Sequence, residues 1–464
     1  MEPKHVIALE IGSSKIRGAA GTVDENGILT VIALEEERLI DCVRYGWIRN
    51  VEEVDSRIHR IIKKLENRLH PRKIKSVYLG IGGLSFMSSP REVTRRLPAP
   101  EEFTEDILAD LRQEAFNLPV GDREVVDVIG RQFYIDRTPE NQPIGVYGQD
   151  IKAEFNIVTC RPLPKQVVNR VIADRLRMGI NGFVVRQIAE GDLVITNEEK
   201  MLGCVLVDFG AETTGVSVYK GGHLQYFATL PLGSRNITLD ITALNCLEEK
   251  AEEYKKIGGN AMGERQTASL IHDSVNYDEI NSYVGARAGE IIANINEQIK
   301  YAGYSPSQLP AGIIIVGAGA KLSRFNERLE TETKLPVRLG APLDSIRFLD
   351  GRIQGPDAVD VISVLYAAAK RGARECMELP QPAVTPQPSA PSTQPVEEQP
   401  TARQQERQAQ PARVAPSHIE PEPEPEEDRP KRKKAGSRFF SKFKDLATNF
   451  LNDDPYDDDF DDQK

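Results

Sequence analysis

The sequence predicts an α/β protein built from two similar halves and followed by a tail of different composition. Apolar stretches typical of strands alternate with amphipathic helix patterns along most of the chain. A strand that runs into an acidic residue and a turn of small residues occurs twice, at Glu10 and at Asp208. After Met377, prolines become frequent and apolar residues rare. A repeated strand-and-turn unit of this kind indicates internal duplication.

The first half shows the order strand, strand, strand, helix, strand. We expect these strands at residues 5–11, 15–23, 28–36 and 76–82, where apolar residues dominate. Asn50 is a suitable N-cap for an amphipathic helix from Val51 to about Leu69, because its side chain can accept a hydrogen bond from a free backbone N–H. This order predicts a mixed sheet that packs against helices.

The second half repeats the pattern. We expect a strand at residues 202–207, a hairpin formed by residues 216–219 and 224–230, and a buried strand at residues 313–316. A helix is expected to begin after Ser234. The strand at 202–207 leads into the second acidic residue and its turn, as the first strand does at Glu10.

Composition and charge exclude several classes of protein. The 464 residues include 59 Lys and Arg against 70 Asp and Glu, a net charge of −11, so we expect no general nucleic-acid binding. The five cysteines are scattered without a CxxC pair, which argues against a disulfide framework or a zinc site. No signal peptide and no long apolar run is visible, and we therefore expect a soluble cytosolic protein.

Three turns carry residues suited to binding a nucleotide. In the first two, backbone N–H groups and hydroxyls can face phosphate oxygens, and the carboxylate beside each turn can hold a hydrated Mg²⁺. The third lets the backbone approach a flat adenine ring closely. Each turn alone is also compatible with an ordinary hairpin. The candidates are Glu10, Gly12, Ser13, Ser14 and Lys15 in the first turn, Asp208, Gly210, Thr213 and Thr214 in the second, and Gly317, Ala318 and Gly319 in the third.

The three turns, in this order, resemble those of the actin-like ATPase superfamily. Within it, the chain resembles the FtsA family of bacterial cell-division proteins over about residues 5–370. Three further stretches carry this resemblance, at residues 231–240, 247–258 and 337–342. The resemblance implies an actin-like fold with two lobes around a nucleotide cleft. It also implies ATP and Mg²⁺ as ligands, with Mg²⁺ near Asp208 and Glu10 and the ribose near Glu252 and Lys255.

The resemblance also implies a division into subdomains. These are a first lobe, 1A, at residues 1–83 and 164–200, an inserted subdomain, 1C, at 84–163, a second lobe, 2A, at 201–245 and 301–376, and a subdomain 2B at 246–300. In the family, 1C takes part in polymerisation. The alternative for residues 84–163 is an ordinary α+β insertion without a special role.

The site departs from the family pattern at three places. The first turn opens with Glu10 where the family has Asp, and Glu212 adds a carboxylate to the second turn. The stretch that holds a Glu-Pro pair in many relatives reads Arg186 to Glu190, with Gln187 or Glu190 as the alternatives for the missing Glu. Phosphoryl transfer depends mostly on positioning. We therefore expect ATP binding with slow or negligible hydrolysis, assign no catalytic residue, and expect Gly317→Phe to abolish binding without unfolding the protein.

The tail shows three segments. Residues 377–430 form a proline-rich linker that buries too little apolar surface to order itself. Residues 431–452 join a basic block to an amphipathic helix pattern, and residues 453–464 form an acidic tail with seven Asp. The apolar face suits an anionic membrane surface, or alternatively a groove on a protein. Its membrane-facing residues are Phe439, Phe440, Phe443, Leu446, Phe450 and Leu451.

The resemblance implies a scaffold that polymerises through 1C and the second lobe. It would tether FtsZ filaments to the inner face of the cytoplasmic membrane at the division septum, together with other division proteins. The FtsZ C-terminal peptide would bind at residues 246–300, where Lys255, Lys256, Arg265 and Arg287 could meet its acidic groups. The alternatives are a pilus-assembly or shape-determining actin relative, or a sugar or acetate-type kinase of the same superfamily.

Overall fold

The computed structural model describes residues 3–263, 275–343, 346–349 and 358–379. The predicted linker from residue 380 onward, the membrane helix and the acidic tail lie outside these residues, as does Arg265. Composition places Met377 and Glu378 at the start of the linker. In the structure they form β19 (Met377–Glu378), which pairs with β6 (Lys73–Ile74), so the folded body extends past the expected boundary.

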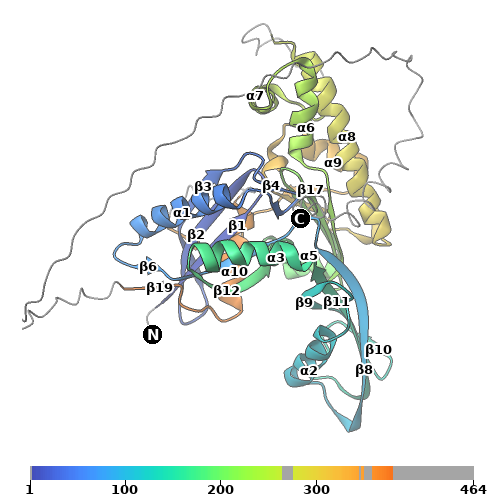
Figure 1. The fold of residues 1–464 in the computed structure, drawn as a ribbon. Helices are drawn as coiled ribbons and strands as arrows, with labels where there is room; N and C mark the ends of the chain where they lie inside the picture. Colours follow the sequence, from blue (N-terminus) through green and yellow to red (C-terminus); the bar gives the residue numbers. More distant parts are fainter. Residues whose placement is uncertain (1–2, 264–274, 344–345, 350–357, 380–464) are drawn as a thin grey trace, which may run out of the picture. The chain divides into compact units, whose positions relative to one another are not determined.

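The first half is built on a six-stranded mixed sheet in the order β12-β7-β1-β2-β3-β18 (Figure 1). β1 pairs with β2 antiparallel and with β7 parallel. The predicted strands of this half are confirmed to within two residues at their ends. The strands are β1 (Lys4–Ile11), β2 (Lys15–Val23), β3 (Leu29–Arg38), β7 (Ser76–Ile81), β12 (Gly179–Val185) and β18 (Ile346–Phe348).

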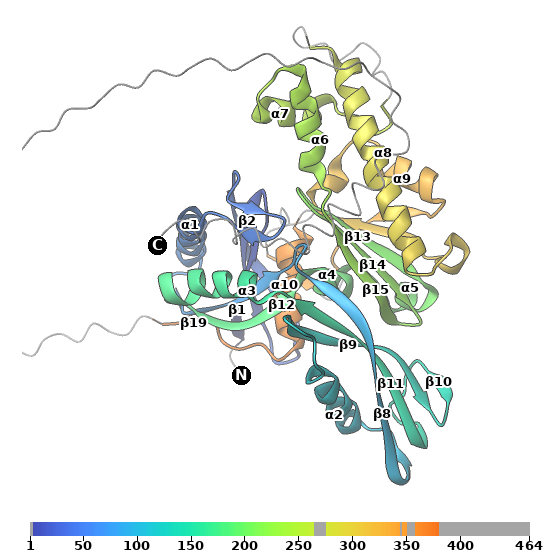
Figure 2. The ribbon, with the colours of Figure 1, turned by 45° about the vertical axis from the view of Figure 1, so that its right-hand side comes forward.

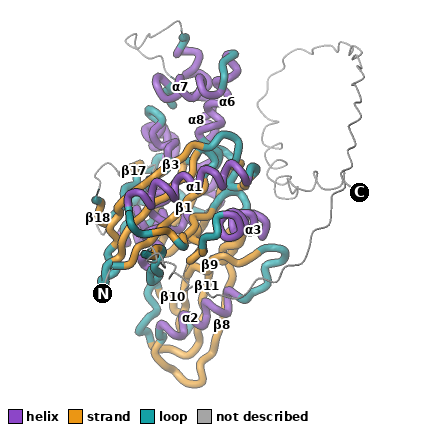
Figure 3. Tube along the Cα trace, turned by 60° about the vertical axis from the view of Figure 1, so that its left-hand side comes forward, coloured by secondary structure: helices purple, strands orange, loops and turns teal. Residues whose placement is uncertain are grey.

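Helix α1 (Val51–Arg68) crosses the strands of this sheet (Figure 3) and begins where the sequence predicts. The Asn50 side chain accepts a hydrogen bond from the backbone N–H of Glu53 at 3.0 Å. The helix is strongly amphipathic, and its buried residues follow one face: Val54, Ile58, Ile61, Ile62 and Leu65. Burial of this face contributes roughly 1.5–3 kcal/mol for each large aliphatic side chain, so packing rather than helix propensity holds α1 in place.

A separate four-stranded antiparallel sheet follows β7 in the chain, in the order β10-β9-β11-β8 (Figure 2). It has its own core, in which Phe133 contacts Phe103 and Phe155 edge to face. Its elements lie within residues 84–163, the range given above to 1C. They are β8 (Met87–Glu102), α2 (Glu105–Phe116), β9 (Glu124–Ile135), β10 (Thr138–Glu140) and β11 (Tyr147–Cys160).

The second half repeats the pairing of the first on a five-stranded sheet, β15-β14-β13-β16-β17. β13 pairs antiparallel with β14 and parallel with β16, as β1 pairs with β2 and β7. The predicted duplication is therefore present in the strand order itself. The strands are β13 (Cys204–Phe209), β14 (Thr214–Lys220), β15 (His223–Leu230), β16 (Ile313–Val316) and β17 (Val337–Leu339).

Helices complete both halves. Helix α10 lies against β1 and α4, and α6 contacts α7 and α8. The remaining elements are β4 (Val43–Arg44), β5 (Trp47–Ile48), α3 (Pro162–Asn169), α4 (Arg186–Val194), α5 (Asn197–Leu202), α6 (Ser234–Ile241), α7 (Glu248–Gly258), α8 (Tyr277–Tyr301), α9 (Phe325–Thr333) and α10 (Val359–Lys370). Among the described residues, no helix is both long enough and apolar enough to cross a bilayer.

Candidate functional site

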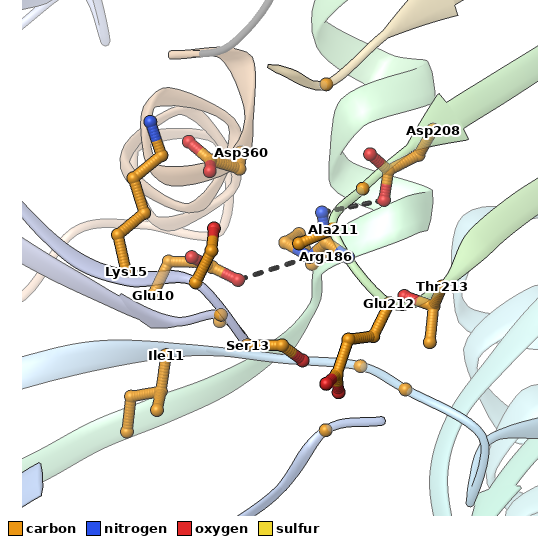
Figure 4. A pocket seen from close by; sticks show the side chains of 18 of the residues that line it. Glu10, Ile11, Ser13, Lys15, Arg186, Asp208, Ala211, Glu212, Thr213 and Asp360 are labelled. Carbon is orange, nitrogen blue, oxygen red and sulfur yellow. Dashed lines mark ion pairs between the residues drawn. The ribbon is translucent and has the colours of Figure 1, made fainter. Parts of the chain in front are cut away.

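The two repeated turns face one cavity (Figure 4), which holds about 750 Å³ when its open mouth is counted. Both turns lie at the ends of strands in the duplicated sheets, so the duplication itself brings them together. The lining residues are Glu10, Ile11, Gly12, Ser13, Ser14, Lys15, Arg17, Gly46, Gly80, Gly82, Gly83, Arg186, Glu190, Asp208, Gly210, Ala211, Glu212, Thr213, Gly317, Ala318 and Asp360.

The first turn joins β1 to β2 as a tight hairpin. The backbone N–H of Gly12 donates to the carbonyl of Lys15 at 3.0 Å, which leaves Ser13 and Ser14 at the tip. Glu10 lies in β1, and its carboxylate lies over the turn, 3.3 Å from the position that a Cβ on Gly12 would take. Hydroxyls and a carboxylate therefore stand side by side at this end of the cavity.

The second turn has the same hydrogen-bonded form. The N–H of Gly210 donates to the carbonyl of Thr213 at 2.9 Å. The turn also contacts the start of α6, where the N–H of Arg235 donates to the carbonyl of Ala211 at 2.7 Å. The two hairpin turns therefore present the same backbone geometry from opposite lobes, an arrangement able to hold the phosphates of a ligand between them.

Arg186 lies at the centre of the cavity, between the two acidic strands (Figure 4). Its Nη1 is 2.7 Å from Oδ2 of Asp208 and 2.9 Å from Oε1 of Glu190, and its Nε is 3.6 Å from Oε1 of Glu10. The guanidinium group thus joins three carboxylates, two of which are the predicted Mg²⁺ ligands.

The carboxylates around Arg186 are buried, and burial controls their protonation. Burial and the nearby Asp360 raise the pKa of Glu10 to about 7, against the lowering effect of Arg186. Burial and Asp208 raise the pKa of Glu190 well above its usual value. Asp360 itself accepts from Nη1 of Arg17 at 2.9 Å. Four carboxyl groups and two arginines therefore lie close together at this cavity.

A divalent ion does not fit at Asp208 and Glu10 as the side chains stand. The Arg186 guanidinium already occupies the space between their carboxylates. Among the described residues, no group of three or more His, Cys, Asp or Glu side chains is arranged to hold a metal ion. The sequence-based expectation of Mg²⁺ between these two residues therefore disagrees with the geometry.

The Glu212 side chain leaves the second turn on the side away from Asp208 (Figure 4). Its Oε1 lies 2.7 Å from Nε of Arg44 and 2.8 Å from Nη1 of Arg235, and its Oε2 accepts from the backbone N–H of Tyr45 at 2.8 Å. The extra carboxylate in the second turn is thus neutralised by two arginines and does not stand free beside a phosphate group.

The third turn follows β16 and packs directly on β13. Gly317 has φ +88°, and a Cβ at this position would lie 2.5 Å from the carbonyl oxygen of Phe209. The expectation that Gly317→Phe would leave the fold intact is therefore wrong, because any side chain there meets the backbone of β13. Gly319 also leaves no room for a side chain, since a Cβ added there would lie 2.6 Å from the Phe209 ring.

The structure brings ten of the predicted ligand residues to the cavity and leaves four outside its lining. The ten are Glu10, Gly12, Ser13, Ser14, Lys15, Asp208, Gly210, Thr213, Gly317 and Ala318. Thr214 is buried and donates to the carbonyl of Leu232 at 2.6 Å, and Gly319 packs on Phe209. Glu252 and Lys255, predicted near the ribose, are instead engaged with the neighbouring helix α6.

Lys255 is a packing residue in this structure. Its ammonium group donates to the carbonyl of Ser234 at 2.9 Å and to Oγ1 of Thr238 at 2.8 Å, and it lies 2.6 Å from Oε2 of Glu252. Of the other cations predicted for an acidic peptide, Lys256 pairs with Glu252 and Arg287 pairs with Asp240 and Glu290. These cations already have acidic neighbours within the chain.

Sequence reasoning did not identify Arg17, Asp360 or Arg186 as site residues. Asp360 lies in α10, more than three hundred residues after Arg17 in the chain, and no local sequence pattern identifies it as a site residue. Of the two alternatives for the missing Glu, Gln187 lies outside the cavity lining and donates to Oγ of Ser217 at 3.1 Å. Glu190 does line the cavity, and its Oε2 is buried without a hydrogen-bond partner among the described residues.

Comparisons with known proteins agree with this architecture. The model of the family described as "Cell division protein FtsA" matches residues 205–369. A protein of that description from Porphyromonas gingivalis is 30% identical over 333 residues, which cover 68% of this chain and 68% of that protein. A second, from Escherichia coli strain K12, is 26% identical over 369 residues, 74% of this chain and 85% of that protein.

One solved structure gives a similarity in fold. The "PilM-PilN type IV pilus biogenesis complex" aligns with a TM-score of 0.55 at 18% identity, over 80% of this chain and 98% of that chain. At this identity the similarity concerns the fold alone. The duplicated mixed sheets around one cavity form the actin-like ATPase fold, and this prediction from the sequence is confirmed.

Proposed function

The chain belongs to the FtsA family of cell division proteins, and from this premise we propose that it binds ATP between its two lobes and links FtsZ filaments to the membrane. The observation that carries the nucleotide part is the pair of matching hairpin turns, one from each duplicated sheet, on one cavity. Backbone N–H groups at such turns are suited to phosphate oxygens. The third turn, at Gly317 and Ala318, closes the same cavity on the side proposed for the adenosine.

The residues of the cavity can bind ATP, but they offer no evident general base to activate water for its hydrolysis. Ser13, Ser14 and Thr213 offer hydroxyl donors to phosphates. Mg²⁺ normally accompanies ATP, but here it would have to share Asp208 and Glu10 with Arg186. Glu190, which lines the cavity and is one of the alternatives for the missing Glu, is paired with Arg186. This arrangement supports nucleotide binding with slow or negligible hydrolysis.

The cellular part of the proposal rests on family membership and on the tail. The protein would polymerise through the subdomain at 84–163 and the second lobe, and act with other division proteins at the septum. The FtsZ C-terminal peptide would bind the subdomain at 246–300. The apolar face at 439–451 would hold the protein on the inner face of the cytoplasmic membrane, since four Phe beside a basic block suit an anionic lipid surface.

A liposome assay tests this proposal. The full chain is mixed with vesicles rich in phosphatidylglycerol and with labelled FtsZ, and filaments that float with the vesicles are measured. We expect recruitment by the wild type and none when FtsZ lacks its C-terminal peptide. Membrane binding without FtsZ recruitment would overturn the proposed link to FtsZ filaments.

A matched pair of variants tests the membrane face. Phe443→Glu with Phe450→Glu places two charges in the apolar arc and should release the protein from the vesicles. Ser441→Glu with Thr448→Glu makes the same change of charge on the opposite side of the predicted helix and should keep most of the binding. Flotation of the first variant at the wild-type level would exclude this face as the anchor.

A further inference from the structure

Arg186 holds the position in which the two acidic strands would otherwise share a metal ion. It is the first residue of α4, directly after β12, and its side chain lines the cavity. The guanidinium group contacts Asp208 from the second lobe and lies near Glu10 from the first. One fixed cation therefore bridges the acidic residues of both halves.

A residue of the same helix fixes the orientation of the Arg186 side chain. Glu190 lies one turn further along α4 and accepts from Nη1 of Arg186 at 2.9 Å. Glu190 is fully buried, and Asp208 and Glu10 are nearly so. Releasing the guanidinium would leave three buried carboxyl groups without their cation, which is costly in a protein interior.

The group is nevertheless open to a ligand. The Arg186 side chain is 17% exposed, and it lines the cavity. Its Nη1 and Nε face the carboxylates, while Nη2 donates to none of the described residues. An arginine edge with unused donors matches a phosphate oxygen in both charge and geometry.

We propose that Arg186 takes the role of the divalent cation in this cavity, so that the chain binds ATP without requiring Mg²⁺. Nη2 donates to a phosphate oxygen while Nη1 keeps its ion pairs with Asp208 and Glu190. A metal ion would have to displace Arg186 from both carboxylates before it could bind there. The inference rests on the nucleotide site proposed above, and it concerns how that site balances charge.

The test measures ATP affinity with and without a divalent ion. The full chain is stripped of metal, and ATP is titrated calorimetrically in buffer with excess EDTA and in buffer with Mg²⁺. We expect the two dissociation constants of the wild type to agree within about threefold. An affinity at least tenfold weaker in EDTA would overturn the inference but leave the nucleotide site standing, whereas no binding in either buffer would overturn both.

Two substitutions locate the effect at Arg186. Arg186→Met keeps the length of the side chain and removes its charge, and in EDTA it should weaken ATP binding by about ten- to a hundredfold, the loss expected for a charge-assisted hydrogen bond. Mg²⁺ should restore part of this loss, because the carboxylates are then free to hold it. Arg186→Lys keeps a cation and should retain binding in EDTA within about tenfold.

Arg68→Met is the matched control, since Arg68 is half exposed on α1 and does not line the cavity. Circular dichroism melting confirms that each variant is folded before titration. ATP binding by a folded Arg186→Met in EDTA at the wild-type affinity would overturn the proposal. The proposal would be supported if Arg186→Met loses ATP affinity in EDTA and Mg²⁺ restores part of it, while Arg68→Met shows neither effect.

Discussion

The Nε atom of Arg44 lies 2.7 Å from Oε1 of Glu212, an ion pair that connects β4 of the first half to the second phosphate turn. Arg235 of α6 contacts the same oxygen and also lies 2.5 Å from Oδ1 of Asp41. Glu212 is 3% exposed, so these charges meet where water screens them little. A residue that departs from the family pattern in the turn thus serves as a link between the two lobes.

Replacing Glu212 should destabilise the protein. Glu212→Gln keeps the shape but removes the charge that Arg44 and Arg235 share, and we expect a loss of about 1–3 kcal/mol in the free energy of unfolding, because Arg44 remains partly exposed. Urea unfolding measures this loss. Glu249→Gln, at an exposed position of α7, is the control and should change stability little. Equal unfolding midpoints for the two variants would show that the link contributes nothing.

Gly317 should tolerate no side chain. Gly317→Ala forces a residue with φ near +88° and places its Cβ against the Phe209 carbonyl, so we expect a loss of at least about 2–3 kcal/mol. Gly372→Ala separates the two causes, since Gly372 has φ +79° and nothing within 4 Å of its Cβ position. It should show only the cost of the backbone conformation. Similar thermal unfolding of both variants would mean that the contact with Phe209 relaxes easily.

Hydrolysis of ATP should be very slow, because Glu190 is poorly suited to act as a base. Its Oε1 is engaged by Nη1 of Arg186 at 2.9 Å, so this oxygen is not free to orient a water molecule. Phosphate release measured over hours should stay near the level of protein-free controls. Glu190→Gln should not change it. A measurable turnover that Glu190→Gln abolishes would show that Glu190 activates water after all.

Much of the fold could be predicted because its signals are local. The strands on either side of the two turns are apolar and short, and the N-cap of α1 is read from Asn50 alone. The two candidate turns could be predicted to share one site, because a duplicated strand order places equivalent turns in equivalent positions. Residues fixed by long-range packing gave no such signal. Asp360 reaches Arg17 only through the docking of α10 on β1, and β18 joins β3 across most of the chain.

Two expectations about the site meet features of the structure that the sequence pattern does not show. Charged residues on helix α7 suggested contact with a ribose, but a Lys on an amphipathic helix can also bury its stem and satisfy its ammonium group on a neighbouring helix. Lys255 does this on α6. The carboxylates Asp208 and Glu10 suggested a metal ion, and only the three-dimensional structure places Arg186 between them.

Glu252 offers a test that separates packing from ligand binding through pH. Burial tends to raise the pKa of this carboxyl group, but Lys255, Thr238 and Lys256 outweigh burial and lower it below the usual value of 4.5. The unfolded chain then binds the proton more tightly than the folded protein. The contribution of Glu252 is therefore present above about pH 4.5 and is lost as the pH falls below it.

Glu252→Gln should remove this contribution and leave ATP affinity unchanged. We expect it to lower the free energy of unfolding by about 1 kcal/mol at pH 7, a modest value because a third of the side chain is exposed. The difference from wild type should shrink when urea unfolding is repeated below about pH 4.5. Glu253→Gln, on the same helix and paired with Lys250 at the surface, should show neither effect. A tenfold loss of ATP affinity in Glu252→Gln without a loss of stability would instead place this residue at the ribose, because a packing residue has no route to the ligand except through the fold.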